Sequence, residues 1–173
     1  MKIQFFIGAL GIALLASTPA AIGADGSGDP AVASEQDGKF FDAQGNPTFK
    51  KDADGTVDWY TLSGFRRYHA ECHTCHGPAG EGSTYAPALV QSLKTMPYAD
   101  FQNVVVNGRV NVGGGHENVM PSFGTNPNVM CYLDDIYVYL RARTAGAVDR
   151  ARPAKNAPKP ASFAEAEKAC MGH

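Results

Sequence analysis

Three residues near the middle of the chain, Cys72, Cys75 and His76, have types and a spacing that suit one particular chemistry. The pattern C-x-x-C-H lets two thiols form thioether bonds with the two vinyl groups of one porphyrin, and the adjoining imidazole then coordinates the iron. Because a thioether does not dissociate, a haem held in this way stays bound in an open compartment. The motif therefore predicts one covalently attached haem c, with His76 as an axial ligand of the iron.

Two other uses of a cysteine pair fit the sequence less well. A structural zinc ion usually takes four Cys or His ligands, and no second ligand pair at a defined spacing is evident. A redox-active dithiol would sit in a thioredoxin-like βαβ unit, which the expected helices do not offer. Haem attachment is therefore the favoured interpretation.

The second axial ligand of the iron is predicted to be Met120. The following Pro121 restrains Met120 to an extended backbone, which suits a thioether presented across a haem. A thioether ligand also raises the reduction potential relative to a second histidine. Met96, which precedes a proline at an expected helix start, is the runner-up. The remaining candidates fit core packing or the C-terminal tail: Met130 and Met171.

Four further residues are expected to shape the haem pocket. Pro87 would offer its backbone carbonyl to the Nδ1–H of His76, which would fix the ring and raise its basicity as a ligand. Leu89 and Phe123 would form apolar walls that favour the less charged ferrous state, a role that overlaps with simple core packing. Arg109 would pair with a haem propionate, and plain surface exposure is the alternative.

Helices are needed to hold these residues, and the apolar spacing predicts three main ones. The first runs over about 62–74, where apolar and aromatic residues recur at three- and four-residue steps up to the haem motif. The second covers about 98–106 and is followed by a glycine-rich loop at 113–115. The third starts at Asn126-Pro127, an N-cap residue followed by proline, and ends near 143–145.

The ends of the chain differ from this helical centre. Residues 1–24 carry one positive charge, a short apolar run and then small residues, which is typical of a cleaved secretory signal. The apolar run is short for a retained membrane span, which needs roughly 20 residues. We expect an extended N-terminal arm over 25–57, a haem-binding domain over 58–145 and a C-terminal extension over 146–173, which includes a short helix at 163–170.

The composition limits the class of partner. The formal net charge is −2 at pH 7 and becomes −3 once the single lysine of the signal segment is removed, so a nucleic-acid partner is not expected. Export would place the protein in the periplasm, and no later stretch is long and apolar enough to cross a membrane. A monomer is the expected state.

The residues around the motif resemble the class I c-type cytochromes. Gly64 and Tyr68 stand eight and four residues before Cys72, where that family has a small residue and an aromatic one. Tyr139 and its neighbours are similar to the terminal helix of that family. In the family, this helix packs on the small residue and the aromatic residue that correspond to Gly64 and Tyr68. The resemblance covers about 59–143. It implies an all-α class I cytochrome c fold, with three main helices around one covalently bound haem and with extended N- and C-terminal arms.

A narrower resemblance rests on three stretches: 58–60, 64–72 and 75–78. They are similar to the four-cysteine, methanol-metabolism-related c-type cytochromes, which include XoxG-type partners of lanthanide-dependent methanol dehydrogenases. The resemblance implies a one-electron carrier, not an enzyme, that accepts electrons from a PQQ-dependent methanol (alcohol) dehydrogenase and passes them to a downstream cytochrome c or oxidase. The alternatives are a general periplasmic cytochrome c serving another donor, and a haem enzyme or gas sensor with an open iron position.

The four-cysteine pattern also accounts for Cys131 and Cys170, and we expect a disulfide between them. Two free thiols would be exceptional in an oxidising compartment. The bond would close a loop of about 40 residues, for which the chain-entropy model gives roughly 3–4 kcal/mol. It would tie back a proline-bearing extension that has too few apolar residues to dock by itself.

The arginines and histidines near the motif do not predict a specific function. Arg66 and Arg67 precede it on the first helix, where a solvated helix face is expected and contact with an acidic partner is the alternative. His69, His73 and His116 are expected to have structural or solvent-facing roles rather than to bind the iron.

Overall fold

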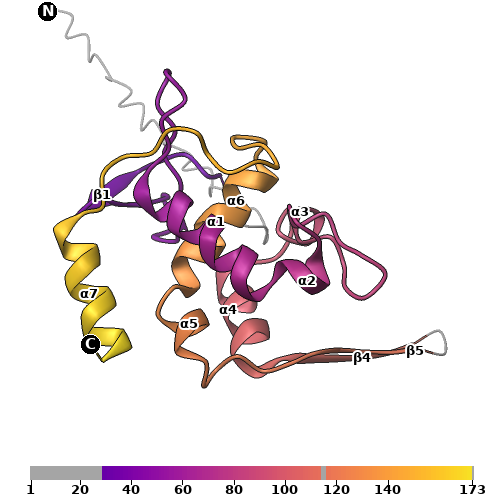
Figure 1. The fold of residues 1–173 in the computed structure, drawn as a ribbon. Helices are drawn as coiled ribbons and strands as arrows, with labels where there is room; N and C mark the ends of the chain where they lie inside the picture. The colour runs from indigo at the N-terminus through magenta and orange to yellow at the C-terminus, as the bar shows by residue number, and fades with distance from the viewer. Residues whose placement is uncertain (1–28, 114–115, 173) are drawn as a thin grey trace, which may run out of the picture.

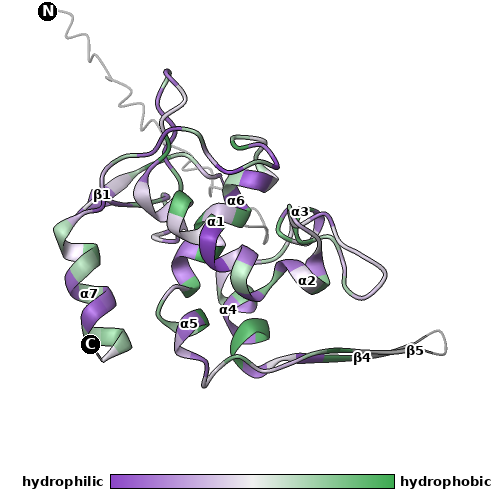
Figure 2. Cartoon of the chain, in the orientation of Figure 1, coloured by the Kyte–Doolittle hydropathy of each residue, from purple (hydrophilic) through white to green (hydrophobic). Residues whose placement is uncertain are grey.

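The computed structural model describes residues 29–113 and 116–172. The predicted signal segment of residues 1–24 lies outside the described residues. Helices dominate the described part, and its strands form two small antiparallel sheets (Figure 1). Figure 2 shows that the helices carry both hydrophobic and hydrophilic residues, as expected when one face of each packs inward. The helices are α1 (Trp59–Glu71), α2 (His73–His76), α3 (Leu89–Ser92), α4 (Tyr98–Asn107), α5 (Pro127–Met130), α6 (Leu133–Thr144) and α7 (Ala161–Met171).

The core is centred on the crossing of α1 and α6. Tyr68 of α1 and Tyr139 and Leu140 of α6 are almost fully buried there. Gly64 permits the close approach, because a Cβ atom at this position would lie 1.8 Å from the carbonyl oxygen of Asp135 and 2.8 Å from the Cβ atom of Tyr139. The predicted close crossing of the two helices at Gly64 is therefore confirmed.

The helix boundaries differ from the sequence prediction in two places. The first helix begins at Trp59, three residues early, because Asp58 caps it by accepting a hydrogen bond of 2.9 Å from the backbone N–H of Thr61. It ends at Glu71, and the haem motif forms the separate short helix α2. The third predicted helix is divided into α5 and α6 by a break at 131–132.

The described part of the predicted N-terminal arm forms a small sheet rather than a free extended chain. Strands β1 (Ser34–Gln36), β2 (Lys39–Phe41) and β3 (Pro47–Thr48) pair antiparallel in that order. The sheet packs on α6, where the guanidinium of Arg141 lies 2.8 Å from the carboxylate of Asp42 and both side chains are almost fully buried. The expected low helix content of this segment holds, but its strands are too short to show a periodicity.

The C-terminal extension is also packed on the body. It forms a parallel bridge between Val57 and Asn156, and Phe163 of α7 is buried against aromatic residues of α1. The structure contains the expected disulfide between Cys131 and Cys170, whose Cα atoms lie 5.7 Å apart. The disulfide thus fastens the end of α7 to the break between α5 and α6.

A two-stranded hairpin projects from the helical body (Figure 1). Its strands, β4 (Arg109–Gly113) and β5 (His116–Met120), pair antiparallel so that Arg109 lies opposite Met120 at the base. The sequence predicted a loop at this point, so the placement of Met120 is corrected to the last residue of a strand. The hairpin was overlooked although Val110 and Val112 alternate with polar residues and a glycine pair follows in the sequence, which together are a local hairpin signal.

Candidate haem site

The two cysteines of the motif are both free thiols, whereas the other two cysteines form the disulfide. Cys72 is half-buried at the C-terminal end of α1, where its backbone N–H donates to the Tyr68 carbonyl at 2.8 Å. Burial raises the pKa of the Cys72 thiol to about 12, so this sulfur is a protonated thiol in the structure and stands for the thioether of a mature protein. Cys75 is exposed in α2. Both sulfurs are therefore available for covalent attachment.

His76 is held in the orientation that an axial ligand needs. Its side chain is buried, and its Nδ1 lies 3.0 Å from the carbonyl oxygen of Pro87. The Nδ1–H therefore donates to Pro87, which leaves the lone pair of Nε2 for a metal. The structure thus contains the hydrogen bond that the sequence analysis expected, and it comes from a loop eleven residues away.

The loop between His76 and Pro87 is shaped by two glycines with positive φ. Gly77 has φ 77° and Gly82 has φ 85°, and a Cβ atom on Gly77 would lie 2.6 Å from the Gly82 carbonyl oxygen. The hydroxyl of Tyr68 donates to the Gly77 carbonyl at 2.5 Å. The buried end of α1 therefore fixes the loop that in turn orients His76.

Met120 lies on the opposite strand of the hairpin base from Arg109 and is half-buried against the main core. The segment after it is anchored to α4, because Phe123 donates its backbone N–H to the Val105 carbonyl at 3.0 Å. Met96 packs on the same core with a half-buried side chain. The choice of Met120 over Met96 as the sixth ligand thus stays a prediction.

The structure places the remaining predicted pocket residues as follows. Leu89 begins α3 and is half-buried against the core, as is Phe123. Arg109 is exposed and forms no ion pair within the described part of the chain, so its pairing with a propionate stays a prediction. Side chains at 111–118, including His116, are outside the described residues.

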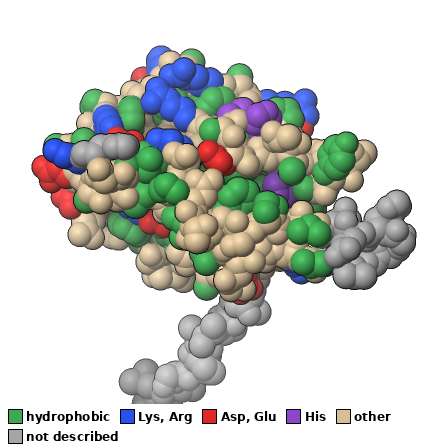
Figure 3. Space-filling view, turned by 60° about the horizontal axis from the view of Figure 1, so that its bottom comes forward, with side chains coloured by type: hydrophobic (Ala, Val, Ile, Leu, Met, Phe, Trp, Pro, Cys, Tyr) green, Lys and Arg blue, Asp and Glu red, His purple; other side chains and the backbone are tan. Residues whose placement is uncertain are grey.

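The apolar surroundings fit a porphyrin. Several hydrophobic side chains around the motif pack on the core with one side and remain partly exposed on the other, and Figure 3 shows hydrophobic side chains spread over the middle of one face with histidine among them. A flat apolar macrocycle would cover such a surface and remove it from water. The partly exposed residues packed on this core include four predicted haem-site residues, Cys72, Leu89, Met120 and Phe123; the others are Phe49, Phe65, Met96, Tyr98, Val106, Met130 and Ala147.

The structure weakens both competing interpretations of the motif. Among the described residues, no group of three or more His, Cys, Asp or Glu side chains is placed to hold a metal ion, as a zinc site would require. The strands in residues 29–113 and 116–172 form only antiparallel pairs, so the parallel unit of a thioredoxin-like dithiol is not found there. In the same residues, no helix is long and apolar enough to cross a bilayer.

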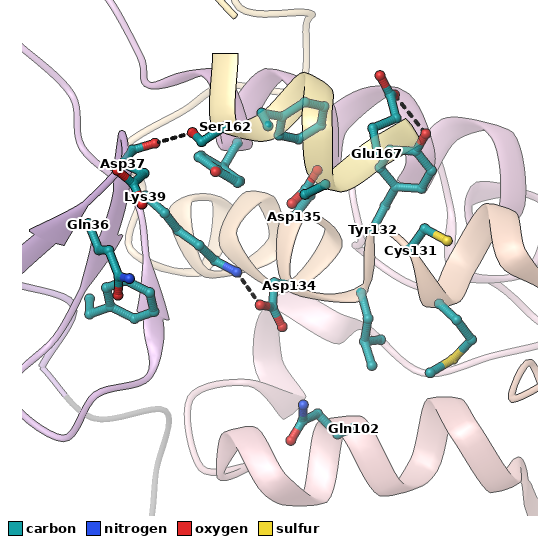
Figure 4. A pocket seen from close by; sticks show the side chains of 16 residues that line it. Gln36, Asp37, Lys39, Gln102, Cys131, Tyr132, Asp134, Asp135, Ser162 and Glu167 are labelled. Carbon is teal, nitrogen blue, oxygen red and sulfur yellow. Dashed lines mark hydrogen bonds and ion pairs between the residues drawn. The ribbon is translucent and has the colours of Figure 1, made fainter. Parts of the chain in front are cut away.

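A cavity elsewhere in the described part of the molecule is separate from the haem motif. It measures about 630 Å³ and lies between the N-terminal sheet, α6 and α7 (Figure 4). Lys39 forms an ion pair with Asp134 in it, and burial raises the pKa of Asp135 to about 7 although Ser63 donates a hydrogen bond of 2.6 Å to that carboxyl. None of the predicted haem-binding residues lines this cavity.

Two arginines that precede the motif differ in their surroundings. Arg66 is exposed, as expected of a solvated helix face. Arg67 is only partly exposed: its guanidinium lies 3.5 Å from the centre of the Tyr132 ring and 3.6 Å from the Glu167 carboxylate. This correction follows from α7, which covers part of α1 and whose docking position could not be derived from local spacing.

The lone histidines of α1 and α2 have structural contacts. His69 lies with its Nδ1 2.8 Å from the Phe65 carbonyl oxygen, one turn earlier in the helix. Its ring stacks on that of His73 with centroids 5.7 Å apart. The expectation that these two residues have structural roles is consistent with these contacts.

Several known proteins similar to this chain are named as cytochromes. Residues 61–140 match the family described as cytochrome C oxidase, cbb3-type, subunit III. Cytochrome c-553I of Paracoccus denitrificans is 52% identical over 136 residues, which cover 79% of this chain and 60% of that protein. Cytochrome c-555 of Methylococcus capsulatus is 41% identical over 93 residues, which cover 53% of this chain and 69% of that protein.

A solved structure is similar over most of the chain. The crystal structure of the c-type cytochrome XoxG from Methylobacterium extorquens AM1 superposes with a TM-score of 0.74 at 56% sequence identity. The match covers 80% of this chain and 85% of the XoxG chain. At this identity the agreement extends beyond the fold to the type of protein.

Proposed function

This chain belongs to the XoxG-type class I c-type cytochromes, and from that premise we propose that it carries electrons singly from a PQQ-dependent methanol dehydrogenase to a downstream cytochrome c or oxidase. The predicted all-α class I cytochrome c fold and the single haem c are confirmed by the same relatives. The protein is an electron carrier rather than an enzyme. The donor is proposed to be of the lanthanide-dependent type and the compartment to be the periplasm.

The observation that carries the proposed donor is the match to XoxG over 80% of the chain. The family model covers only residues 61–140, whereas the match to XoxG extends beyond this range. The similarity is therefore not limited to the generic haem domain. This chain matches only 60% of the length of cytochrome c-553I from Paracoccus denitrificans. The donor and acceptor are therefore part of the proposal.

The residues of this chain divide the work of holding the cofactor. We assign Cys72 and Cys75 to the covalent bonds and His76 to the proximal side of the iron, with Pro87 fixing its ring. Met120 is the proposed distal ligand. The haem supplies one-electron chemistry by cycling between ferrous and ferric iron. The packed crossing of α1 and α6 limits how much the surroundings rearrange when the charge changes.

The chain is proposed to be processed and organised as follows. Residues 1–24 form the signal segment, 58–145 form the cytochrome domain, and the flanking segments 25–57 and 146–173 are extensions of that domain. The mature protein is proposed to be a monomer. Each transfer moves one electron, so a donor that carries two electrons in its reduced quinone needs two successive encounters with this carrier, which suits small interfaces that release quickly.

The direct test is stopped-flow reduction of the oxidised protein by a purified PQQ-dependent methanol dehydrogenase from the same genome, with the haem absorption as readout. We expect rapid reduction that depends on methanol. Reduction by no such dehydrogenase would remove the proposed donor and leave the carrier role intact. Carbon monoxide added to the ferrous protein at neutral pH is the control for an open iron position: rapid binding would argue against Met ligation.

A further inference from the structure

A groove of about 360 Å³ runs between α1 and α7, apart from the haem motif and centred elsewhere than the 630 Å³ cavity. Five residues on one face of α1, from Trp59 to Ala70, form one wall. Lys159, Phe163 and Glu167 of the C-terminal extension form the other. The groove therefore exists only because the extension is docked beside the helix that carries the motif.

The groove is basic in a chain whose overall charge is negative. It holds three cationic side chains, Arg66, Arg67 and Lys159, against the single carboxylate of Glu167. Glu167 pairs with Lys159 and with Arg67, and the hydrogen bond from Lys159 is the main reason that its pKa is lowered. Two of the cations therefore share one internal carboxylate, and the groove keeps a net positive charge.

Arg66 is the cation that this internal carboxylate does not reach. Its guanidinium lies 5.5 Å from the centre of the Trp59 ring, and it forms no ion pair within residues 29–113 and 116–172. The indole Nε1–H of Trp59 is buried and has no acceptor in the same part of the chain. The groove thus contains one exposed guanidinium that lacks an oxygen acceptor within the described residues, and the Trp59 ring beside it carries a buried N–H that also lacks one.

The groove reaches the end of α1 that bears the haem. Ala70, its last residue on α1, is two residues before Cys72, so the two lie about 3 Å apart along the helix axis but on opposite sides of the helix. Its other wall follows residue 140, outside the part matched by the family model. A contact shared by all such domains would use the matched part, so this groove suits a partner particular to this kind of cytochrome.

We propose that the α1–α7 groove is the docking site for an acidic surface segment of the electron-donating dehydrogenase, a carboxylate of which pairs with Arg66. This inference rests on the proposed function and adds the surface on which the donor is recognised. Guanidinium–carboxylate pairing gives directional contacts, and the positive groove speeds the encounter at low ionic strength. The disulfide supports the site by fixing α7, which carries Glu167 and Phe163.

The test compares Arg66→Glu and Arg66→Gln with the wild-type holoprotein in stopped-flow reduction by the dehydrogenase, over a range of ionic strength. Arg152→Glu is the matched control, since Arg152 is exposed and outside the groove and the substitution changes the net charge equally. We expect the second-order rate constant of Arg66→Glu to fall on the order of tenfold at low salt, with Arg66→Gln intermediate. The deficit should shrink as salt is added.

Folding and haem chemistry are checked separately, by the haem spectrum and by reduction with uncharged hydroquinone, which should be unchanged in all variants. Wild-type rates and salt dependence in Arg66→Glu would overturn the docking site while leaving the proposed function standing. An equal loss in Arg152→Glu would show a general charge effect and also overturn it. If the dehydrogenase fails to reduce even the wild-type protein, the donor assignment and the docking site both fall.

Discussion

The two ends of α1 lie in contrasting surroundings. Its C-terminal end leads into the haem side, which we define as α2, the loop 77–88, α3 and the hairpin; here apolar side chains are half-buried and backbone hydrogen bonds shape the turns. Its N-terminal end lies in the packing side, defined as the N-terminal sheet, α6 and α7, which contains a buried ion pair, a disulfide and clustered aromatic rings.

This difference indicates that the packing side is stabilised by contacts within the chain, whereas the haem side needs a bound cofactor to cover its apolar surface. The packing side pairs the buried charges of Asp42 and Arg141 within the chain and buries its own aromatic side chains, so its folding needs no further component. The haem side leaves apolar surface that a bound macrocycle would cover. Substitutions on the packing side should therefore change the stability and spare the haem spectrum, while substitutions on the haem side should do the reverse.

The largest expected effect on stability is that of Asp42→Ala. It removes the carboxylate that lies 2.8 Å from Arg141 in a fully buried pair, which should lower the free energy of unfolding by about 3–5 kcal/mol. Guanidinium denaturation followed by circular dichroism measures the loss. Asp52→Ala is the control, because the Lys50–Asp52 pair is about half exposed and should matter by less than about 1 kcal/mol. Equal losses in both variants would contradict the assignment of this pair to the core.

The next effect is that of Cys170→Ser, which breaks the tie to Cys131. We expect a loss of about 3–4 kcal/mol and faster hydrogen exchange in α7, since the disulfide closes a loop over a sequence separation of 39 residues. Hydrogen exchange with mass spectrometry locates the change. The haem absorption spectrum should remain that of the wild type, and loss of the haem would show that the two sides are not independent.

Asp135 makes the stability of the packing side depend on pH. Burial raises its pKa to about 7 from an ordinary value of 3.8, so the folded state keeps a proton that the unfolded state loses. Stability should therefore fall as the pH rises from about 4 to about 7, by roughly 2–4 kcal/mol. Unfolding at pH 5 and pH 8 measures the slope. Asp135→Asn should flatten this slope, and an unaltered slope in that variant would assign the dependence to another group.

The smallest effect on stability, but the largest on the haem, is expected of Met120→Ala. Removing a half-buried side chain at the hairpin base should cost about 1–2 kcal/mol. The open iron position should bind carbon monoxide rapidly, and the reduction potential should change, as measured by spectroscopic titration. Met96→Ala is the matched control and should bind carbon monoxide slowly. The opposite result for the two variants would make Met96 the ligand.

The haem side was predictable from sequence because its information is local. Cys72, Cys75 and His76 stand within five residues of each other, and a loop proline eleven residues later supplies the hydrogen bond to His76. The close crossing at Gly64 followed from the resemblance to a known family. The position of Met120 at the end of a strand was missed because the alternation of Val110 and Val112 and the glycine pair after them were interpreted as a loop rather than as a hairpin.

The packing side was less predictable because its contacts join distant segments. The pairing of Asp42 with Arg141 spans 99 residues, and strands of two or three residues carry no periodic signal. The position of α7 beside α1, which covers Arg67, depends on aromatic packing and on the disulfide. Only the N-cap role of Asp58, directly before Trp59, had a local signal that was overlooked.

The central claim is that one haem is joined to the chain at Cys72 and Cys75. Intact mass spectrometry of the mature protein, followed by peptide mapping, tests it most directly. We predict a mass equal to that of the processed chain plus one haem, with the added mass on the peptide that contains residues 72–76. A mature protein without this added mass, or with the haem released by unfolding, would contradict the account.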